Sequence, residues 1–298
     1  MSIIFDVVIG NPPYQDPNEK VRSNPLWSRF TLLNFSLVRE GGWLTLITPP
    51  LWMSGIDEQS PKKKKELVNI FFGNKLIYVR TNAGSFFPGV GTKAASYLVQ
   101  KNRRQNATTS FLTDDACFTL DISQIEMLPL YNLTPQILSI FKKIFYSGRP
   151  LCGFSSEGCI STKDINYSSG TGAYRIYNSK KVMVYTDVKP RNMFSKKLIV
   201  SLPGRLDPFY DPGICGLSVN CRWIEVQSEC EAEAYIRALE SPLFKLLFAS
   251  YKYNGFNNTW MIKHFPIIFP FSSLTDLYQQ FDLSSEDLEY INNNESSS

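Results

Sequence analysis

Residues 5–15 read FDVVIGNPPYQ, and they hold the groups in this sequence whose types and spacing best suit a chemical step. Val7 to Ile9 form an apolar run that predicts a buried strand. The run stops at Asn11-Pro12-Pro13-Tyr14, because two successive prolines have no backbone N–H to donate to a sheet. The loop that follows is therefore expected to be stiff, with its polar groups pointing outward.

This corner could hold an exocyclic amine of a nucleobase by its two hydrogens. Such an amine is a poor nucleophile, because its lone pair is delocalised into the ring. The Asn11 side-chain oxygen and the Pro12 carbonyl are fixed acceptors that would let the nitrogen pyramidalise as it attacks an electrophile, which is catalysis by position rather than by proton transfer. Tyr14 could stack on a base swung out of the helix, where stacking is worth about 1–3 kcal/mol. The alternative interpretation is a proline-rich turn that merely ends a strand.

The segment resembles motif IV, the NPPY signature of S-adenosylmethionine-dependent amino methyltransferases that act on adenine N6, and specifically the Eco57I-like branch. Two later segments resemble further motifs in the family's order: Gly41 to Gly55 (GGWLTLITPPLWMSG) the motif V region, and Phe86 to Asn102 (FFPGVGTKAASYLVQKN) the motif VIII region. Each is common alone, and their order and spacing strengthen the joint signal. The resemblance implies that Phe86 or Phe87 packs beside the target base, and it implies four catalytic residues: Asn11, Pro12, Pro13 and Tyr14.

In this branch a cofactor-binding half precedes the NPPY strand, with a Gly-rich loop after one strand and an acidic residue ending the next. The present sequence begins at Met1, five residues before Asp6. We therefore expect the full S-adenosyl-L-methionine site to lie outside this chain, with only the Asp6 region near the cofactor. A permuted copy is not expected, because Gly170-Thr171-Gly172 follows no clear strand and precedes no helix, and Gly89-Val90-Gly91 already belongs to the segment that resembles motif VIII.

The elements that would position these motifs are strands near residues 3–9, 43–48, 75–79 and 94–100, and helices near 25–39 and 61–72. By resemblance the strands are the fourth to seventh of a Rossmann-like methyltransferase sheet, so the expected fold class is α/β with the later strands only. The first strand then lies at an open edge, and a flat apolar edge strand is a pairing hazard. We expect a protein partner or a missing N-terminal segment to cover it.

Composition indicates which broad classes of protein this chain can belong to. With 298 residues and 43% hydrophobic residues the chain can bury a sizeable core. No apolar run approaches the ~20 residues that span a bilayer, and Met1 to Tyr14 shows no basic n-region with a cleavage site, so we expect a cytoplasmic protein without membrane contact. Six cysteines without a CxxC pair and one histidine, His264, predict no metal site. The acids from Asp282 onward leave residues 1–281 with 31 basic and 22 acidic residues, or +9, which favours a polyanion partner.

Beyond Asn102 the pattern changes. A helix is expected over residues 132–147, short β-type runs over 181–188, 197–202 and 217–226, and two further helices to about 239 and 251, the first from a capping box at Ser228 and Glu231. In the family a variable domain after the motif VIII strand reads DNA. The expected organisation is a methyltransferase portion at residues 1–130, a mixed α+β target-recognition domain at 131–281 and an acidic, unstructured tail at 282–298.

Candidate DNA contacts in that domain are arginines for guanine, asparagines for adenine and basic side chains for phosphate. They are Arg175, Lys189, Arg191, Arg205, Arg222, Asn257 and Asn258.

The resemblance implies a site-specific DNA adenine-N6 methyltransferase of the restriction-modification type, acting on double-stranded DNA with S-adenosyl-L-methionine and a separate cofactor-binding half. By resemblance, Asn rather than Ser at residue 11 favours adenine N6 over cytosine N4 as the methylated atom. The long second half of the chain favours DNA over a protein glutamine as the substrate. Two alternatives stay open: an inactive relative that binds DNA or a methyltransferase partner, and a truncated reading frame without a role of its own. Nothing in the sequence indicates an endonuclease or a recognition sequence.

Overall fold

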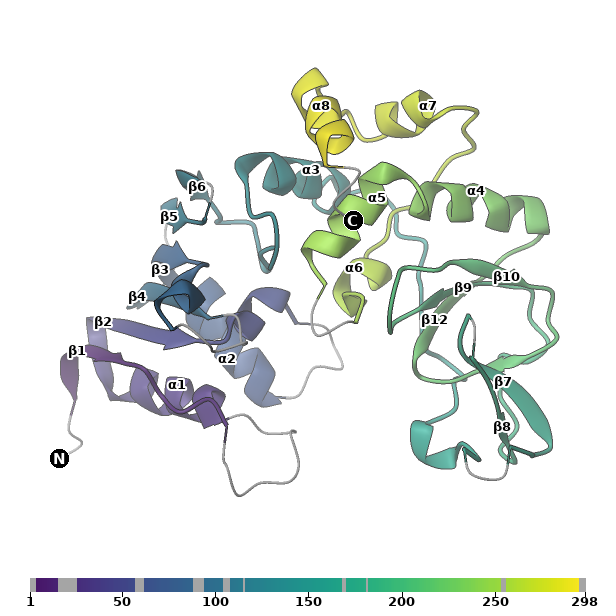
Figure 1. The fold of residues 1–298 in the computed structure, drawn as a ribbon, viewed down its shortest axis with the longest axis horizontal. Helices are drawn as coiled ribbons and strands as arrows, with labels where there is room; N and C mark the ends of the chain where they lie inside the picture. The colour runs from purple at the N-terminus through teal and green to yellow at the C-terminus, as the bar shows by residue number, and fades with distance from the viewer. Residues whose placement is uncertain are drawn as a thin grey trace. The chain divides into compact units, whose positions relative to one another are not determined.

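The computed structural model describes residues 4–15, 26–56, 62–87, 94–103, 108–114, 116–167, 170–180, 182–252 and 256–294. The chain divides into two compact units, Met1–Pro135 (unit 1) and Gln136–Ser298 (unit 2), close to the division expected at residue 130. Both units mix helices and strands, which confirms the predicted α/β class (Figure 1).

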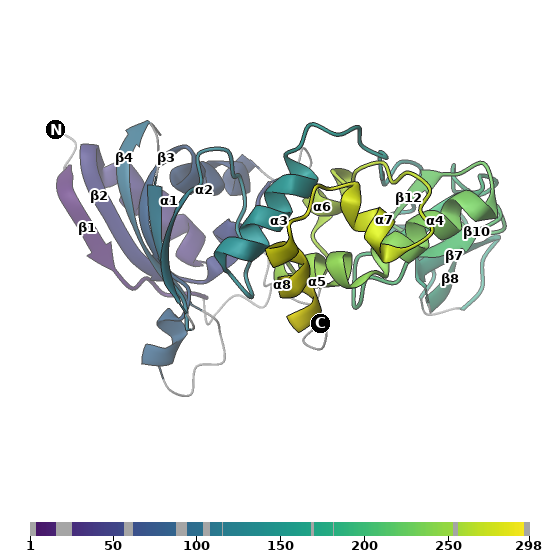
Figure 2. The same ribbon diagram turned by 90° about the horizontal axis from the view of Figure 1, so that it is seen from above.

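Unit 1 is built on a six-stranded sheet with the strand order β1-β2-β4-β3-β5-β6. Strands β1 and β2 are parallel, as are β3 and β5, while β4 is antiparallel to both of its neighbours. Figure 2 shows β1 as the outermost strand on one side of the sheet. The bounds are Phe5–Gly10 (β1), Val38–Thr48 (β2), Asn74–Arg80 (β3), Ala95–Arg103 (β4), Thr108–Leu112 (β5) and Cys117–Asp121 (β6).

Helices α1 (Leu26–Leu37) and α2 (Lys62–Phe72) connect β1 to β2 and β2 to β3. They contact each other and the sheet. In α2 the apolar residues recur at helical spacing and are buried, whereas Lys62 and Lys63 in the first turn are exposed. These two helices and strands β1 to β4 confirm the six elements expected for the methyltransferase portion, and strands β5 and β6 were not anticipated.

An aromatic cluster lies under the carboxyl ends of β1 and β2. Trp52, from the short helix η1 (Pro50–Ser54), stacks on Phe71 of α2 with ring centroids 3.9 Å apart, and Tyr97 of β4 meets Phe71 edge-on at 4.7 Å. All three side chains are fully buried. Such stacked and edge-on pairs contribute beyond their buried area and fix ring positions. The cluster makes a rigid floor beneath the loops at this edge.

Unit 2 contains two three-stranded sheets, ordered β10-β9-β12 and β11-β7-β8, together with helices. Helices α3, α4 and α5 confirm the three predicted here, and Ser228 caps α4 by accepting from the Glu231 N–H as the capping box predicts. The strands are Tyr174–Ser179 (β7), Val182–Thr186 (β8), Lys197–Ser201 (β9), Phe209–Asp211 (β10), Gly216–Leu217 (β11) and Cys221–Glu225 (β12). The helices are Pro135–Phe145 (α3), Glu229–Leu239 (α4), Pro242–Ser250 (α5), Thr259–Lys263 (α6), Leu274–Gln279 (α7) and Ser285–Asn293 (α8), and a short 3-10 turn, η3, spans Thr162–Asp164.

Helix α8 corrects the expectation of an unstructured tail from residue 282 onward. It spans Ser285–Asn293, begins with a capping box between Ser284 and Asp287, and buries Ile291 completely. The physical reason is that a short acidic helix can be fixed by one apolar anchor and one buried carboxylate, which the charge pattern alone does not reveal. Residues 295–298 lie outside the described ranges.

Within the described ranges, no helix has the length and apolar character needed to cross a bilayer.

Candidate functional site

The strand register brings the predicted motifs to one edge of the sheet in unit 1. Gly10 at the end of β1 is paired with Leu46 of β2, Leu46 with Tyr97 of β4, and Tyr97 with Val79 of β3. These residues form one row across four strands. The loops after β1, β2 and β3 therefore leave the sheet at the same edge, the carboxyl edge of the parallel strands, where α/β sheets bind their ligands.

Asn11 to Tyr14 lie at this edge with the polar groups open and the rings partly sheltered. Asn11 and Pro13 are exposed, Pro12 is buried and Tyr14 is half-buried. The Asn11 side chain makes no hydrogen bond with the described residues, so its oxygen is free to accept one from a ligand. Burial raises the pKa of the Tyr14 phenol, which therefore stays neutral at physiological pH. The exposure of Asn11 agrees with the expectation that polar groups of this loop point outward. The roles of Asn11, Pro12, Pro13 and Tyr14 in catalysis stay predictions.

Tyr97 lies behind this corner with a buried hydroxyl. The Trp52 ring lies 5.6 Å from the Tyr97 ring, and its Nε1 forms no hydrogen bond within the part of the chain that the structure describes. Burial raises the pKa of Tyr97 well above its usual value, the Thr31 and Thr48 hydroxyls partly offset this, and the Tyr14 phenol raises it further. An unpaired buried N–H such as the Trp52 Nε1 is uncommon in a packed core. No local pattern of residues predicts it, because its surroundings are set by the fold.

The predicted base-contacting residues follow β3 at the same edge. Phe86 ends the short helix η2 (Ala83–Phe86), is 55% exposed, and has the Arg80 guanidinium 4.1 Å from its ring centroid. The Arg80 Nε donates to the Asn82 side chain at 2.6 Å, which orients it. Phe87 is half-buried. Residues 88–93, most of the predicted motif VIII loop, lie outside the described ranges.

Asp6 lies at the opposite end of β1 from Asn11, and its carboxylate forms an ion pair with Arg39 of β2. A Cβ on Gly42 would lie 2.7 Å from the Asp6 carbonyl, so only glycine allows β2 to approach β1 this closely. The structure thus gives Asp6 a role in fastening β1 to β2. Contact with a cofactor at Asp6 stays a prediction.

The predicted DNA contacts of unit 2 separate into exposed and buried groups. Arg175, Lys189, Arg191 and Arg205 are exposed and free to reach a partner. Arg222 is 7% exposed, and its guanidinium donates to the Val219 and Cys221 carbonyls at 2.9 and 2.8 Å. These bonds correct the expectation for Arg222, because a buried guanidinium that binds its own loop cannot also reach a base.

Asn257 and Asn258 also bind backbone. The Asn257 amide is buried and donates to the Ser201 carbonyl at 2.9 Å, and the Asn258 side chain accepts from two N–H groups to cap α6. Both correct the expectation that these side chains are available to read adenine. The amide of an asparagine suits backbone capping and base reading equally, so only tertiary contacts separate the two roles.

Asn257 and Arg205 line a hollow of about 400 Å³ between the loop before β10 and helix α5. Its charged lining has both signs and includes residues that the sequence analysis did not select, because they are scattered along the chain. The charged residues are Arg205, Asp207, Glu240, Lys245 and Lys252. No group of three metal-ligating side chains is found within the described ranges.

A family model confirms the resemblance over the first part of the chain. Residues 2–86 match the family described as Eco57I restriction-modification methylase. This segment contains β1 to β3, the Asn11 to Tyr14 corner and the predicted motif V region. No curated protein matches the chain.

Solved structures of restriction-modification proteins are similar at low identity. The type I restriction enzyme EcoKI M protein is 13% identical, with 37% of this chain and 25% of that chain covered and a TM-score of 0.29. The type ISP enzyme LlaGI, solved with a DNA substrate mimic, is 10% identical over 82% of this chain and 38% of that chain, with a TM-score of 0.39. The type IIL enzyme MmeI, solved with DNA, is 8% identical over 77% and 42%, with a TM-score of 0.38. The chain thus spans well under half the length of these proteins.

Proposed function

We propose that this chain, whose residues 2–86 match the Eco57I restriction-modification methylase family, forms the catalytic and DNA-reading portion of an adenine-N6 methyltransferase. The observation that carries the proposal is the Asn11 to Tyr14 corner. The Asn11 amide, which is exposed and has no hydrogen-bond partner among the described residues, and the half-buried Tyr14 ring lie at the carboxyl edge of parallel strands, next to the stacked Trp52 and Phe71 rings.

The chain's own residues hold the amine of the target base. The Asn11 Oδ1 and the Pro12 carbonyl accept the two hydrogens of adenine N6, which orients the nitrogen lone pair, and the Tyr14 ring stacks on the flipped base. When bound, S-adenosyl-L-methionine supplies an electrophilic methyl group. No described residue has to act as a base, because the methylated amine loses its extra proton to water.

The described residues supply the amine side of the site and do not make a complete cofactor pocket. What supports a partner is strand β1, which pairs with β2 alone among the strands that the structure describes. Its side chains Phe5, Val7 and Ile9 are 46%, 53% and 79% exposed. An apolar strand with one unpaired edge is a template for a further strand. We assign a separate cofactor-binding half to this edge, so that methionine and ribose contacts come from outside the described residues.

Unit 2 supplies the proposed DNA contacts. Arg175, Lys189, Arg191 and Arg205 are exposed and can bind phosphate or guanine in double-stranded DNA. Arg205 and Asp207 both line the hollow, and a guanidinium and a carboxylate can hydrogen-bond to guanine and cytosine, respectively.

The experiment is methyl transfer by the chain together with the polypeptide encoded next to it, using labelled S-adenosylmethionine and genomic DNA. Asn11→Ala is expected to lower the rate by about 100-fold or more, because one of two fixed acceptors is lost. Asn102→Ala is the matched control, since Asn102 is an exposed asparagine in the same sheet. Mass spectrometry of the DNA should show N6-methyladenine.

Full activity of Asn11→Ala, or N4-methylcytosine as the product, would contradict the proposed mechanism. The competing function is an inactive relative that binds DNA or a methyltransferase without transferring a group. It predicts DNA binding that weakens with salt and no labelled DNA under any pairing.

A further inference from the structure

Two loops of unit 2 meet and expose its most accessible large apolar side chains. Phe194, between β8 and β9, is 74% exposed, and Ile214, between β10 and β11, is 64% exposed. A Cβ on Gly213, whose φ is +99°, would lie 2.8 Å from the Phe194 carbonyl, so the two loops are in contact. We call Phe194 and Ile214 the apolar tip.

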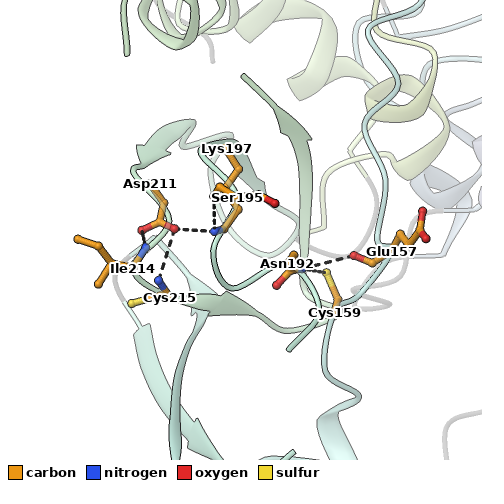
Figure 3. A network of polar contacts seen from close by, with 8 residues as sticks. All are labelled: Glu157, Cys159, Asn192, Ser195, Lys197, Asp211, Ile214 and Cys215. Atoms are coloured by element: carbon orange, nitrogen blue, oxygen red, sulfur yellow. Dashed lines mark hydrogen bonds and ion pairs between the residues drawn. The ribbon is translucent and has the colours of Figure 1, made fainter. Parts of the chain in front are cut away.

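A buried ion pair holds both loops at the tip. The Lys197 Nζ lies 2.7 Å from the Asp211 Oδ2, and the two side chains are 0% and 1% exposed (Figure 3). The Lys197 ammonium also donates to the Ser195 carbonyl at 2.9 Å, beside Phe194. The Asp211 carboxylate accepts from the Ile214 N–H at 3.3 Å. Each member of the pair therefore fixes the backbone next to one exposed side chain.

This arrangement is unusual for loops without a partner. Burying two charges costs desolvation free energy that an apolar pair of similar size would avoid, so the ion pair is better explained by positioning than by stability. An exposed phenylalanine next to an exposed isoleucine is also unfavourable in water. The fold fixes two apolar side chains where they gain nothing from the chain's own core.

Basic side chains lie in the same loop as Phe194. Lys189 and Arg191 are exposed, and the Lys189 Nζ lies 5.7 Å from the Phe194 ring centroid. Lys196 is also exposed and donates to the Gln227 carbonyl at 3.5 Å. The acid in this loop, Asp187, already accepts hydrogen bonds from Asn166 and Ala173. An apolar side chain with a cation beside it is complementary to a duplex, in which stacked bases lie between two phosphate backbones.

We propose that the apolar tip is a wedge that inserts between stacked base pairs of double-stranded DNA, while Lys189 and Arg191 bind the flanking phosphates. Proteins that bend DNA use apolar side chains in this way, and unstacking a step lets the bent duplex contact more protein. The inference rests on the proposed function, because it takes DNA as the partner of unit 2. It adds a DNA-distorting element that is separate from the base-flipping corner in unit 1.

The test compares binding of the full chain to two short duplexes of one mixed sequence, with and without a central abasic site, by fluorescence anisotropy. A missing base removes the stacking that a wedge must break, so the wild-type chain should prefer the abasic duplex by about tenfold, the size of one stacking contact. The double variant Phe194→Ser/Ile214→Ser should lose this preference and keep its salt dependence. Phe269→Ser, at a residue that is 57% exposed elsewhere in unit 2, should keep the preference.

Thermal unfolding is measured for every variant, so that only variants with the wild-type midpoint enter the comparison. A wild-type chain that binds both duplexes equally, or a double variant that retains the preference, overturns the wedge. A double variant that changes only the oligomeric state in size-exclusion chromatography identifies the tip as a protein interface and also overturns it. Asn11→Ala should keep the abasic preference, so the methyl-transfer experiment and this one can fail independently.

Discussion

The burial of strand β1 and of helix α8 is the opposite of what the residues of each segment suggest. β1 reads FDVVIG and is apolar, yet five of its six residues are exposed and the sixth is half-buried. α8 reads SEDLEYINN and is acidic, yet Ile291 is fully buried and Asp287 is 3% exposed. Composition tells how well a segment could pack, whereas the neighbouring elements decide whether it does.

The anchoring of α8 depends on one carboxylate with two partners. The Asp287 Oδ2 accepts from the Lys143 ammonium of α3 at 2.5 Å and from the Ser284 N–H at 2.9 Å. The same side chain thus caps α8 and fastens it to α3. Besides its backbone pairing with β2, the one side-chain ion pair of β1 within the described ranges is the exposed pair of Asp6 with Arg39, a kind of contact that contributes little in water. The difference teaches that α8 is fixed within the described chain and that β1 has a surface left for a partner.

The largest expected effect is the loss of the apolar anchor of α8. Ile291→Ala should lower the free energy of unfolding by about 2–4 kcal/mol, because it removes buried methyl groups and leaves a cavity. Leu274→Ala in α7, at a residue that is 43% exposed, is the control and should change it by less than about 0.5 kcal/mol. Urea denaturation followed by circular dichroism measures both. Equal effects would mean that α8 does not pack as described.

The second largest effect on stability is expected at Asp287, and it should depend on pH. Burial raises the pKa of Asp287, but the hydrogen bonds from Lys143 and Ser284 outweigh burial, and the pKa is lowered overall. A carboxyl group with a lowered pKa in the folded state stabilises that state above its unfolded pKa of about 3.9 and loses the contribution as pH falls through the folded pKa.

Asp287→Asn should therefore cost about 1–3 kcal/mol at pH 7, the range for a hydrogen bond to a charged group. The difference from wild type should shrink as the pH falls below about 4. Asp276→Asn is the matched control, because Asp276 closes the capping box of α7 on the exposed surface and, within the described ranges, forms no ion pair like that of Asp287 with Lys143. It should have the smaller effect. A difference between wild type and Asp287→Asn that does not depend on pH would show that the carboxylate charge is not what anchors α8.

The elements with strong local signals could be predicted from the sequence. Strand β1 ends directly before Asn11, as its run of apolar residues suggests, whereas Gly41 and Gly42 lie within β2 and not in a turn before it. Strands β5 and β6 and helix α8 were missed because they are short and their positions depend on contacts with distant segments. Local pattern is informative only where an element is long or sharply bounded.

The candidate site shows the same division. The exposure of Asn11 follows from two prolines that end a strand, so it could be predicted locally. Arg222, Asn257 and Asn258 could not be separated from Arg205 by residue type, because burial is set by which carbonyl or N–H lies nearby in the fold. The Lys197–Asp211 pair was likewise invisible, since its partners come from different strands.

The smallest effect on stability is expected at β1, and it sharpens the comparison most. Ile9 is 79% exposed, so Ile9→Ser should change the free energy of unfolding by less than about 0.5 kcal/mol, whereas the same kind of change at a buried strand residue such as Ile199 should cost several times more. Binding of the cofactor-supplying polypeptide should nevertheless weaken, because the substitution removes apolar area from the edge assigned to it. Paired measurements of urea denaturation and of association by analytical ultracentrifugation separate the two effects. A large loss of stability with unchanged association would show that the exposed side of β1 is already covered by the chain itself, and β1 would then be no different in kind from α8.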